Sequence, residues 1–199
     1  MLRIHFTGED LARTRLASSA DPLWELVLAV DMLRGQRGDL FFTDWRRRTA
    51  EALRRGPMAR ELRLWLVLTP TMGCFPDFLT PGESLRGFEH GIEAVRSTPV
   101  SVLARDLRRL DAPRAAHPLL RRLSEGDAGL LAALGDGMRA FHEAAIVPYG
   151  PGMAAAVERD RAARVAAMTG GGVEELLPKA TWSDAGCCWC PRTSASCTP

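Results

Sequence analysis

The sequence predicts a mainly α fold, a multi-helix bundle that carries one short N-terminal strand and ends in a disordered C-terminal tail. Apolar residues recur at intervals of three and four over most of the chain, which is the spacing of amphipathic helices. Prolines and glycines separate these segments where helices begin and end. The last thirteen residues break the pattern, because four of the five cysteines lie there.

The N-terminus combines a strand pattern with a helix start. Residues 2–6 alternate apolar and polar side chains, which predicts a strand. Thr7 and Asp10 have the spacing of a capping box that opens a helix over about residues 9–17. A lone strand leaves its backbone donors and acceptors unpaired, and the chain offers no second convincing strand. We therefore expect the partner of this strand to be missing from the sequence.

The next three helices are expected to contribute to the core. Asp21 has the position of an N-cap, and Pro22 is then the first residue of a helix that runs to about residue 35. Apolar residues at helical spacing follow throughout this segment. Two more helices are predicted, over about residues 42–55 and 57–68.

An irregular connection follows these helices. Residues 69–82 contain three prolines and two glycines, so we expect a loop, and such a loop could cover a pocket. Five further helices are predicted, over about residues 83–96, 99–110, 116–124, 127–147 and 151–169. Glycines at 170–172 interrupt the pattern before a short segment at 173–177.

Composition and hydropathy exclude several classes of protein. The formal net charge of the 199 residues is +2 at pH 7, which gives no reason for strong attraction to nucleic acid or to an anionic membrane. The most apolar stretches, residues 23–32 and 62–72, fall short of the roughly 18 apolar residues that span a bilayer. No apolar signal segment follows Met1. We expect a cytoplasmic protein without membrane partners.

No catalytic or metal site can be nominated from the sequence. His142-Glu143 resembles the start of a zinc-protease motif, but Ile146 occupies the position of the second histidine, so an ordinary helix position is favoured. The arginine clusters at 46–48 and 54–55 are interleaved with acidic residues, which is typical of a solvated helix face rather than a nucleic-acid contact. We expect no enzyme activity and no cofactor.

Large aromatic side chains give the only candidate ligand pocket. Such residues line small-molecule cavities between helices, although plain core packing is the commoner role for any one of them. The residues expected near a pocket are Trp24, Trp65, Phe75, Phe78 and Tyr149.

The C-terminal tail admits two readings. Thiolates at Cys187, Cys188, Cys190 and Cys197 could hold a soft metal ion, but the spacing lacks the C-x-x-C unit of a tetrahedral site. The second reading is a shift of reading frame. Residues 181–198, written in G/C-leaning codons, can be read in another frame as L-E-R-R-G-L-L-L-V-P-S-Y-F-C-I-V-H. We therefore predict a helical domain over residues 1–178 and an irregular tail over 179–199 that reads as out of frame.

Several segments resemble actinobacterial ArsR-like winged-helix transcriptional regulators that carry a long N-terminal domain. They include the opening residues 1–7, residues 10–15 and 21–26, the segment 75–81, Pro148-Tyr149, residues 156–161 and residues 171–174, and the resemblance covers roughly residues 1–178. It implies that this chain is a truncated or frameshifted relative without the DNA-binding winged helix. It also implies that the strand at 2–6 lacks its usual neighbours.

Two functions are therefore expected from the sequence. The first is the sensor or dimerisation domain of a transcriptional regulator, which would bind a small-molecule effector or form a homodimer and would not bind DNA by itself. The alternative is a free-standing helical protein that binds a small molecule under the 69–82 loop.

Overall fold

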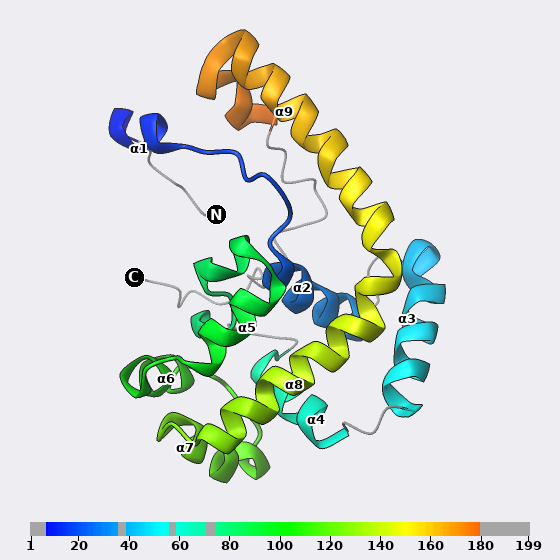
Figure 1. Cartoon of the computed structure of the whole chain (residues 1–199), viewed down its shortest axis with the longest axis vertical. Coiled ribbons are helices and arrows are strands. Elements are labelled where there is room, and N and C mark those ends of the chain that lie inside the picture. Colours follow the sequence, from blue (N-terminus) through cyan, green and yellow to red (C-terminus); the bar gives the residue numbers. More distant parts are fainter. Residues whose placement is uncertain (1–6, 36–38, 56–58, 71–74, 180–199) are drawn as a thin grey trace. The chain divides into compact units, whose positions relative to one another are not determined.

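The computed structural model describes residues 7–35, 39–55, 59–70 and 75–179 (Figure 1). All regular elements in these ranges are helices, so the predicted mainly α, multi-helix fold is confirmed. The strand expected at 2–6 and nearly all of the 179–199 tail lie outside the described residues. The described residues form two compact units, one of residues 21–150 and one of residues 7–20 with 151–179. The helical domain predicted from the sequence, residues 1–178, includes both units.

The larger unit holds seven α-helices among its described residues. They are α2 (Pro22–Arg34), α3 (Asp39–Arg55), α4 (Ala59–Leu68), α5 (Phe88–Arg96), α6 (Val100–Leu107), α7 (His117–Ser124) and α8 (Ala128–Ala145). Short 3-10 helices connect some of them: η1 (Asp77–Leu79), η2 (Gly82–Arg86), η3 (Arg114–Ala116) and η4 (Val147–Tyr149). No helix in the described part of the chain is long and apolar enough to cross a membrane.

Helix α8 is the centre of the larger unit. It contacts α2, α3, α4, α5 and α7, and Figure 1 shows α4 and α5 beside it. Glycines permit the closest approaches. A Cβ atom at Gly137 would lie 2.4 Å from the backbone oxygen of Glu61 in α4, and one at Gly135 would lie 3.2 Å from Ile92 in α5. The backbones of α8 and α4 therefore touch where Gly137 stands.

One apolar cluster fills the larger unit. Its buried side chains come from α2, α4, α5, α6, α7 and α8, and Trp45 and Leu53 of α3 pack against it half-buried. This shared packing explains why these short helices are stable together although each would be marginal alone. The largest fully buried members are Trp65, Phe141, Leu23, Leu26, Leu68, Leu79, Ile92, Leu103, Leu123, Leu134 and Met138.

The predicted cap at the start of α2 is confirmed and extends further than the sequence indicates. Asp21 Oδ1 accepts hydrogen bonds from the backbone N–H groups of Leu23 and Trp24, at 2.9 and 3.3 Å. Its other oxygen, Oδ2, accepts a hydrogen bond of 2.8 Å from the hydroxyl of Ser84 in η2. One carboxylate thus caps α2 and attaches the connection that precedes α5.

Side chains from neighbouring helices bind the carbonyl groups at several helix C-termini. The Arg34 guanidinium donates to the carbonyls of Leu66 and Thr69 at the end of α4. Arg46 Nε donates to Met32 O in the last turn of α2, at 2.7 Å, and Trp45 Nε1 donates to Ala145 O at the end of α8, at 2.8 Å. These bonds satisfy carbonyl groups that a helix cannot pair internally.

The helices expected at 83–96 and at 9–17 are shorter in the structure. The helix expected at 83–96 is divided at Gly87, whose φ of 135° is accessible to glycine and strained for other residues. Its first part is the 3-10 helix η2, and only Phe88–Arg96 is α-helical. The helix expected at 9–17 ends sooner, as α1 (Gly8–Arg13). Helix α1 buries no residue, so no packing stabilises further turns.

The smaller unit contains α1 and most of α9 (Gly150–Lys179). The capping box predicted for Thr7 and Asp10 is present: the Thr7 hydroxyl accepts from Asp10 N, and the Asp10 carboxylate accepts from Thr7 N at 2.9 Å. Helix α9 continues past the expected end at residue 169 and is interrupted only at Gly172, where φ is 72°. Of the glycines at 170–172, one therefore breaks the helix.

Candidate functional site

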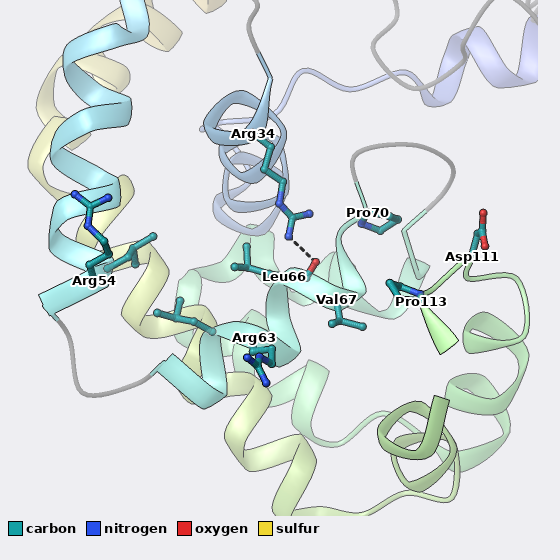
Figure 2. Close-up of a pocket in the computed structure, with 10 residues that line it drawn as sticks. Arg34, Arg54, Arg63, Leu66, Val67, Pro70, Asp111 and Pro113 are labelled. Atoms are coloured by element: carbon teal, nitrogen blue, oxygen red, sulfur yellow. Dashed lines mark hydrogen bonds between the residues drawn. The ribbon is translucent and has the colours of Figure 1, made fainter. Parts of the chain in front are cut away.

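An open groove on the larger unit is the candidate site (Figure 2). It has a volume of about 810 Å³, within the range of small-molecule sites in proteins. Its lining comes from the ends of α2 and α3, from α4 and from the segment at 111–113. We call it the arginine groove and define it by Arg34, Leu53, Arg54, Leu62, Arg63, Leu66, Val67, Pro70, Asp111 and Pro113.

The apolar lining of the arginine groove follows from the sequence of α4. This helix carries more apolar residues than one buried face can take. Leu64, Trp65 and Leu68 are fully or almost fully buried in the core, whereas Leu66 and Val67 stay half-buried and face the groove. Prolines at 70 and 113 add apolar surface without a backbone donor. A ligand could therefore bury apolar surface here.

Arg34 is the only groove arginine held by the protein within the described residues. It occupies the last turn of α2 and points across the groove to the end of α4, as Figure 2 shows. Its guanidinium donates to Leu66 O at 2.7 Å and to the carbonyl of Thr69. Both acceptors are neutral, and partial burial lowers the pKa of Arg34 while Asp31 acts in the opposite sense. Its positive charge is not neutralised by an ion pair among the described residues.

The other charges of the groove are exposed. Arg54 and Arg63 make no ion pair and no side-chain hydrogen bond within the part of the chain that the structure describes, and neither does Asp111. Elsewhere in the larger unit arginines are often paired; Arg139, for example, donates to Glu89 at 2.7 Å and to Asp136 at 3.0 Å. The groove thus carries three arginines and one aspartate. Its field favours an anion.

The five residues predicted to lie near a pocket do not gather in one place. None of them lines the arginine groove. Trp24 and Phe75 meet edge to face, with ring centroids 5.6 Å apart, and Trp24 is 43% exposed. Trp65 and Phe78 are buried in the core, and Tyr149 is half-buried in η4. The Trp65 indole N–H has no hydrogen-bond partner among the described residues. Their role in a pocket stays a prediction.

A second polar cluster joins α5 to α8. The His142 ring stacks on Phe88, with the ring centroids 4.0 Å apart. Burial lowers the pKa of His142, while the charges of Glu143 and Glu89 oppose this shift. The hydrogen bond from Arg139 holds the pKa of Glu89 below its ordinary value. Across the described residues, no three His, Cys, Asp or Glu side chains gather to hold a metal ion. This cluster connects two helices through ion pairs and stacking.

Sequence reasoning missed the groove arginines. The interleaved charges around Arg54 predict a solvated helix face, and no sequence pattern distinguishes Arg34 or Arg63. The three residues lie in α2, α3 and α4, at spacings of 20 and 9 along the chain, and no linear motif connects them. One signal was available: an arginine in the last turn of a helix is well placed to bind carbonyl groups at helix ends.

Comparisons with known proteins give no relative. The chain matches no protein-family model, no curated protein and no solved structure.

Proposed function

We propose that this chain is the helical, non-DNA-binding part of an ArsR-like transcriptional regulator, and that its effector is a small molecule bound in the arginine groove. The observation that carries the ligand-binding part is the groove itself. Its volume of about 810 Å³, its half-buried apolar residues and its three arginines, none of which forms an ion pair among the described residues, support a small-molecule site. The regulator assignment is supported by the sequence segments that resemble that family.

Effector binding would act on a regulator through the helices that form the groove. The groove joins the ends of α2 and α3 to α4, and α4 packs on α8 at Gly137. A ligand bound more tightly by one arrangement of these helices would shift the population towards it. In an intact regulator, such a shift would be transmitted to a DNA-binding domain.

A thermal-shift screen tests the ligand-binding proposal. The full chain is heated with a set of small acids, bases and neutral compounds, and hits are titrated. We expect a saturable rise in the unfolding temperature with some acids, because a ligand that binds only the folded state stabilises it. Val67→Trp, which fills the groove, should abolish the shift. Leu85→Trp is the matched control, since Leu85 is 56% exposed and does not line the groove.

The outcomes of this screen are distinct once circular dichroism shows that both variants are folded. A hit that Val67→Trp removes and Leu85→Trp retains supports the groove as the site. A complete absence of hits, or hits that Val67→Trp leaves unchanged, overturns the proposal.

The alternative function is a free-standing helical small-molecule-binding protein. The groove favours it equally, because nothing in the groove requires a DNA-binding partner. The coding DNA downstream of the codon for Lys179, translated in all three frames, separates the two. A winged helix in a shifted frame supports the regulator, and its absence favours the free-standing binding protein.

A further inference from the structure

The charge distribution in the arginine groove narrows the class of ligand. This step rests on the proposed function, because it assumes that the groove binds a small molecule. Figure 2 shows Arg54 at the α3 side and Asp111 at the opposite side, with Arg34 and Arg63 between them. Positive charge is therefore concentrated along one part of the groove, and the single acidic group stands at the other end.

The arginine side chains are suited to a carboxylate. A guanidinium is planar and presents five N–H donors in a fork that matches two carboxylate oxygens. Arg34 uses two of its nitrogens on Leu66 and Thr69, so further N–H groups remain for a ligand. Arg54 and Arg63 have all their donors free with respect to the described residues.

The rest of the groove favours an apolar, uncharged body. Leu53, Leu66 and Val67 are half-buried and line it together with prolines at 70 and 113. Burial of this surface by a hydrocarbon or aromatic group would add to the electrostatic attraction. A second negative charge at the far end of the ligand would lie near Asp111 and would be repelled.

We infer that the arginine groove binds an amphipathic monoanion, a small carboxylic acid with an apolar body and one charged end. The carboxylate lies in the part of the groove that carries the arginines, and the apolar body lies over α4. Simple inorganic anions should bind more weakly because they lack the apolar part, and neutral alcohols because they lack the charge. The second carboxylate of a dicarboxylate would be repelled by Asp111.

Three probes of equal length test this class directly: octanoate, 1-octanol and octanedioate. Their dissociation constants for the full chain are measured by isothermal titration calorimetry. We expect octanoate to bind at least fivefold more tightly than either of the other two. Raising the salt concentration from about 0.05 to 0.5 M should weaken octanoate and leave 1-octanol nearly unchanged, because exposed charges are screened.

Substitutions locate the charged end. Arg54→Met and Arg63→Met keep an apolar stem, remove one charge each and should each weaken octanoate about 2- to 5-fold, as for an exposed ion pair. Arg121→Met is the matched control, since Arg121 is also exposed and lies outside the groove. It should leave the affinity unchanged. All three positions are exposed, so the variants are expected to fold, and circular dichroism checks this.

Each result supports or overturns the inference. If octanoate and 1-octanol bind equally well, or if the groove variants behave like Arg121→Met, the monoanion class is wrong while the small-molecule proposal stands. If octanedioate binds best, the argument from Asp111 is wrong. If no probe binds and the broader screen also has no hit, both proposals fall together.

Discussion

The contact between α8 and α4 allows a sharp test of the packing. Gly137→Ala would place a Cβ atom 2.4 Å from Glu61 O, 2.6 Å from the Glu61 carbonyl carbon and 3.2 Å from Leu62 N. Ordinary contacts begin at 3.4 Å, so the two backbones must separate by about 3.4 − 2.4 = 1.0 Å. Unlike a side chain, the backbone of α4 cannot rotate away.

The magnitude follows from two opposing effects. Overpacking of a close-packed interior costs about 1–3 kcal/mol, and a rigid backbone obstacle places this site at the upper end. Replacing glycine by alanine inside a helix returns about 0.5–1 kcal/mol. We therefore expect Gly137→Ala to lower the free energy of unfolding by about 2 kcal/mol, or the unfolding temperature by about 4–8 °C in a chain of this size.

Urea unfolding followed by tryptophan fluorescence is a suitable assay, because the described tryptophans, Trp24, Trp45 and Trp65, all lie in the larger unit. Gly129→Ala is the control on the same helix. Its added Cβ would meet only the carboxylate oxygen of Asp127, at 3.3 Å, which is the end of a flexible side chain. It should change the free energy of unfolding by less than about 1 kcal/mol. If Gly137→Ala is as stable as Gly129→Ala, α4 and α8 do not touch as described.

Three further predictions concern polar groups that are buried or half-buried. Asp21→Ala removes the α2 cap and the hydrogen bond from Ser84. It should lower the free energy of unfolding by about 2 kcal/mol in the same assay. Asp77→Ala is the control, because Asp77 is exposed, and it should change this free energy little. Thr49→Val replaces a fully buried hydroxyl that has no hydrogen-bond partner among the described residues. Urea unfolding should therefore show a free energy of unfolding that is unchanged or raised by up to about 1 kcal/mol. A clear decrease in this free energy would mean that the hydroxyl is hydrogen-bonded. The pKa of His142 is lowered from 6.5 by burial, so the unfolded state binds the proton more readily and stability is lost as the pH falls below about 6.5. His142→Gln should therefore reduce the difference in stability between pH 7.5 and pH 5.5, and an undiminished difference would assign it to other groups.

Much of the helical architecture could be predicted because its signals are local. Asp21 with Pro22 marks the start of α2, and Thr7 with Asp10 marks the start of α1. The division of the 83–96 segment was missed because a glycine inside an apolar pattern does not reveal its φ angle. Gly87 adopts 135° in the folded chain, and residues 82–86 form a 3-10 helix held by Ser84 and Asp21. That contact spans 63 positions in the sequence, so no local pattern contains it.

The candidate site could not be predicted for a similar reason. Its arginines are far apart in the chain. They differ from other arginines in their ion-pair and hydrogen-bond partners, which only the folded structure determines. Arg47 and Arg48 pair with Asp44, as the interleaved charges of that segment suggest. Arg54 belongs to the same helix and lines the groove instead. Aromatic residues were a poor guide for this groove, since a large ring serves a core and a pocket equally well, and Trp65 lies in the core.

Where a side chain of one helix caps the C-terminus of another, the end of the capped helix depends less on the connection that follows it. Helices α2, α4 and α8 have terminal carbonyl groups bound by Arg46, Arg34 and Trp45, which come from other helices. Each helix end is thus fixed in part by a side chain from elsewhere in the chain, in addition to local signals such as Gly35, whose backbone N–H donates to Asp31 O at the end of α2. Insertions after these helices should be tolerated at the modest entropic cost of a longer loop, about 0.6 kcal/mol per doubling of its length.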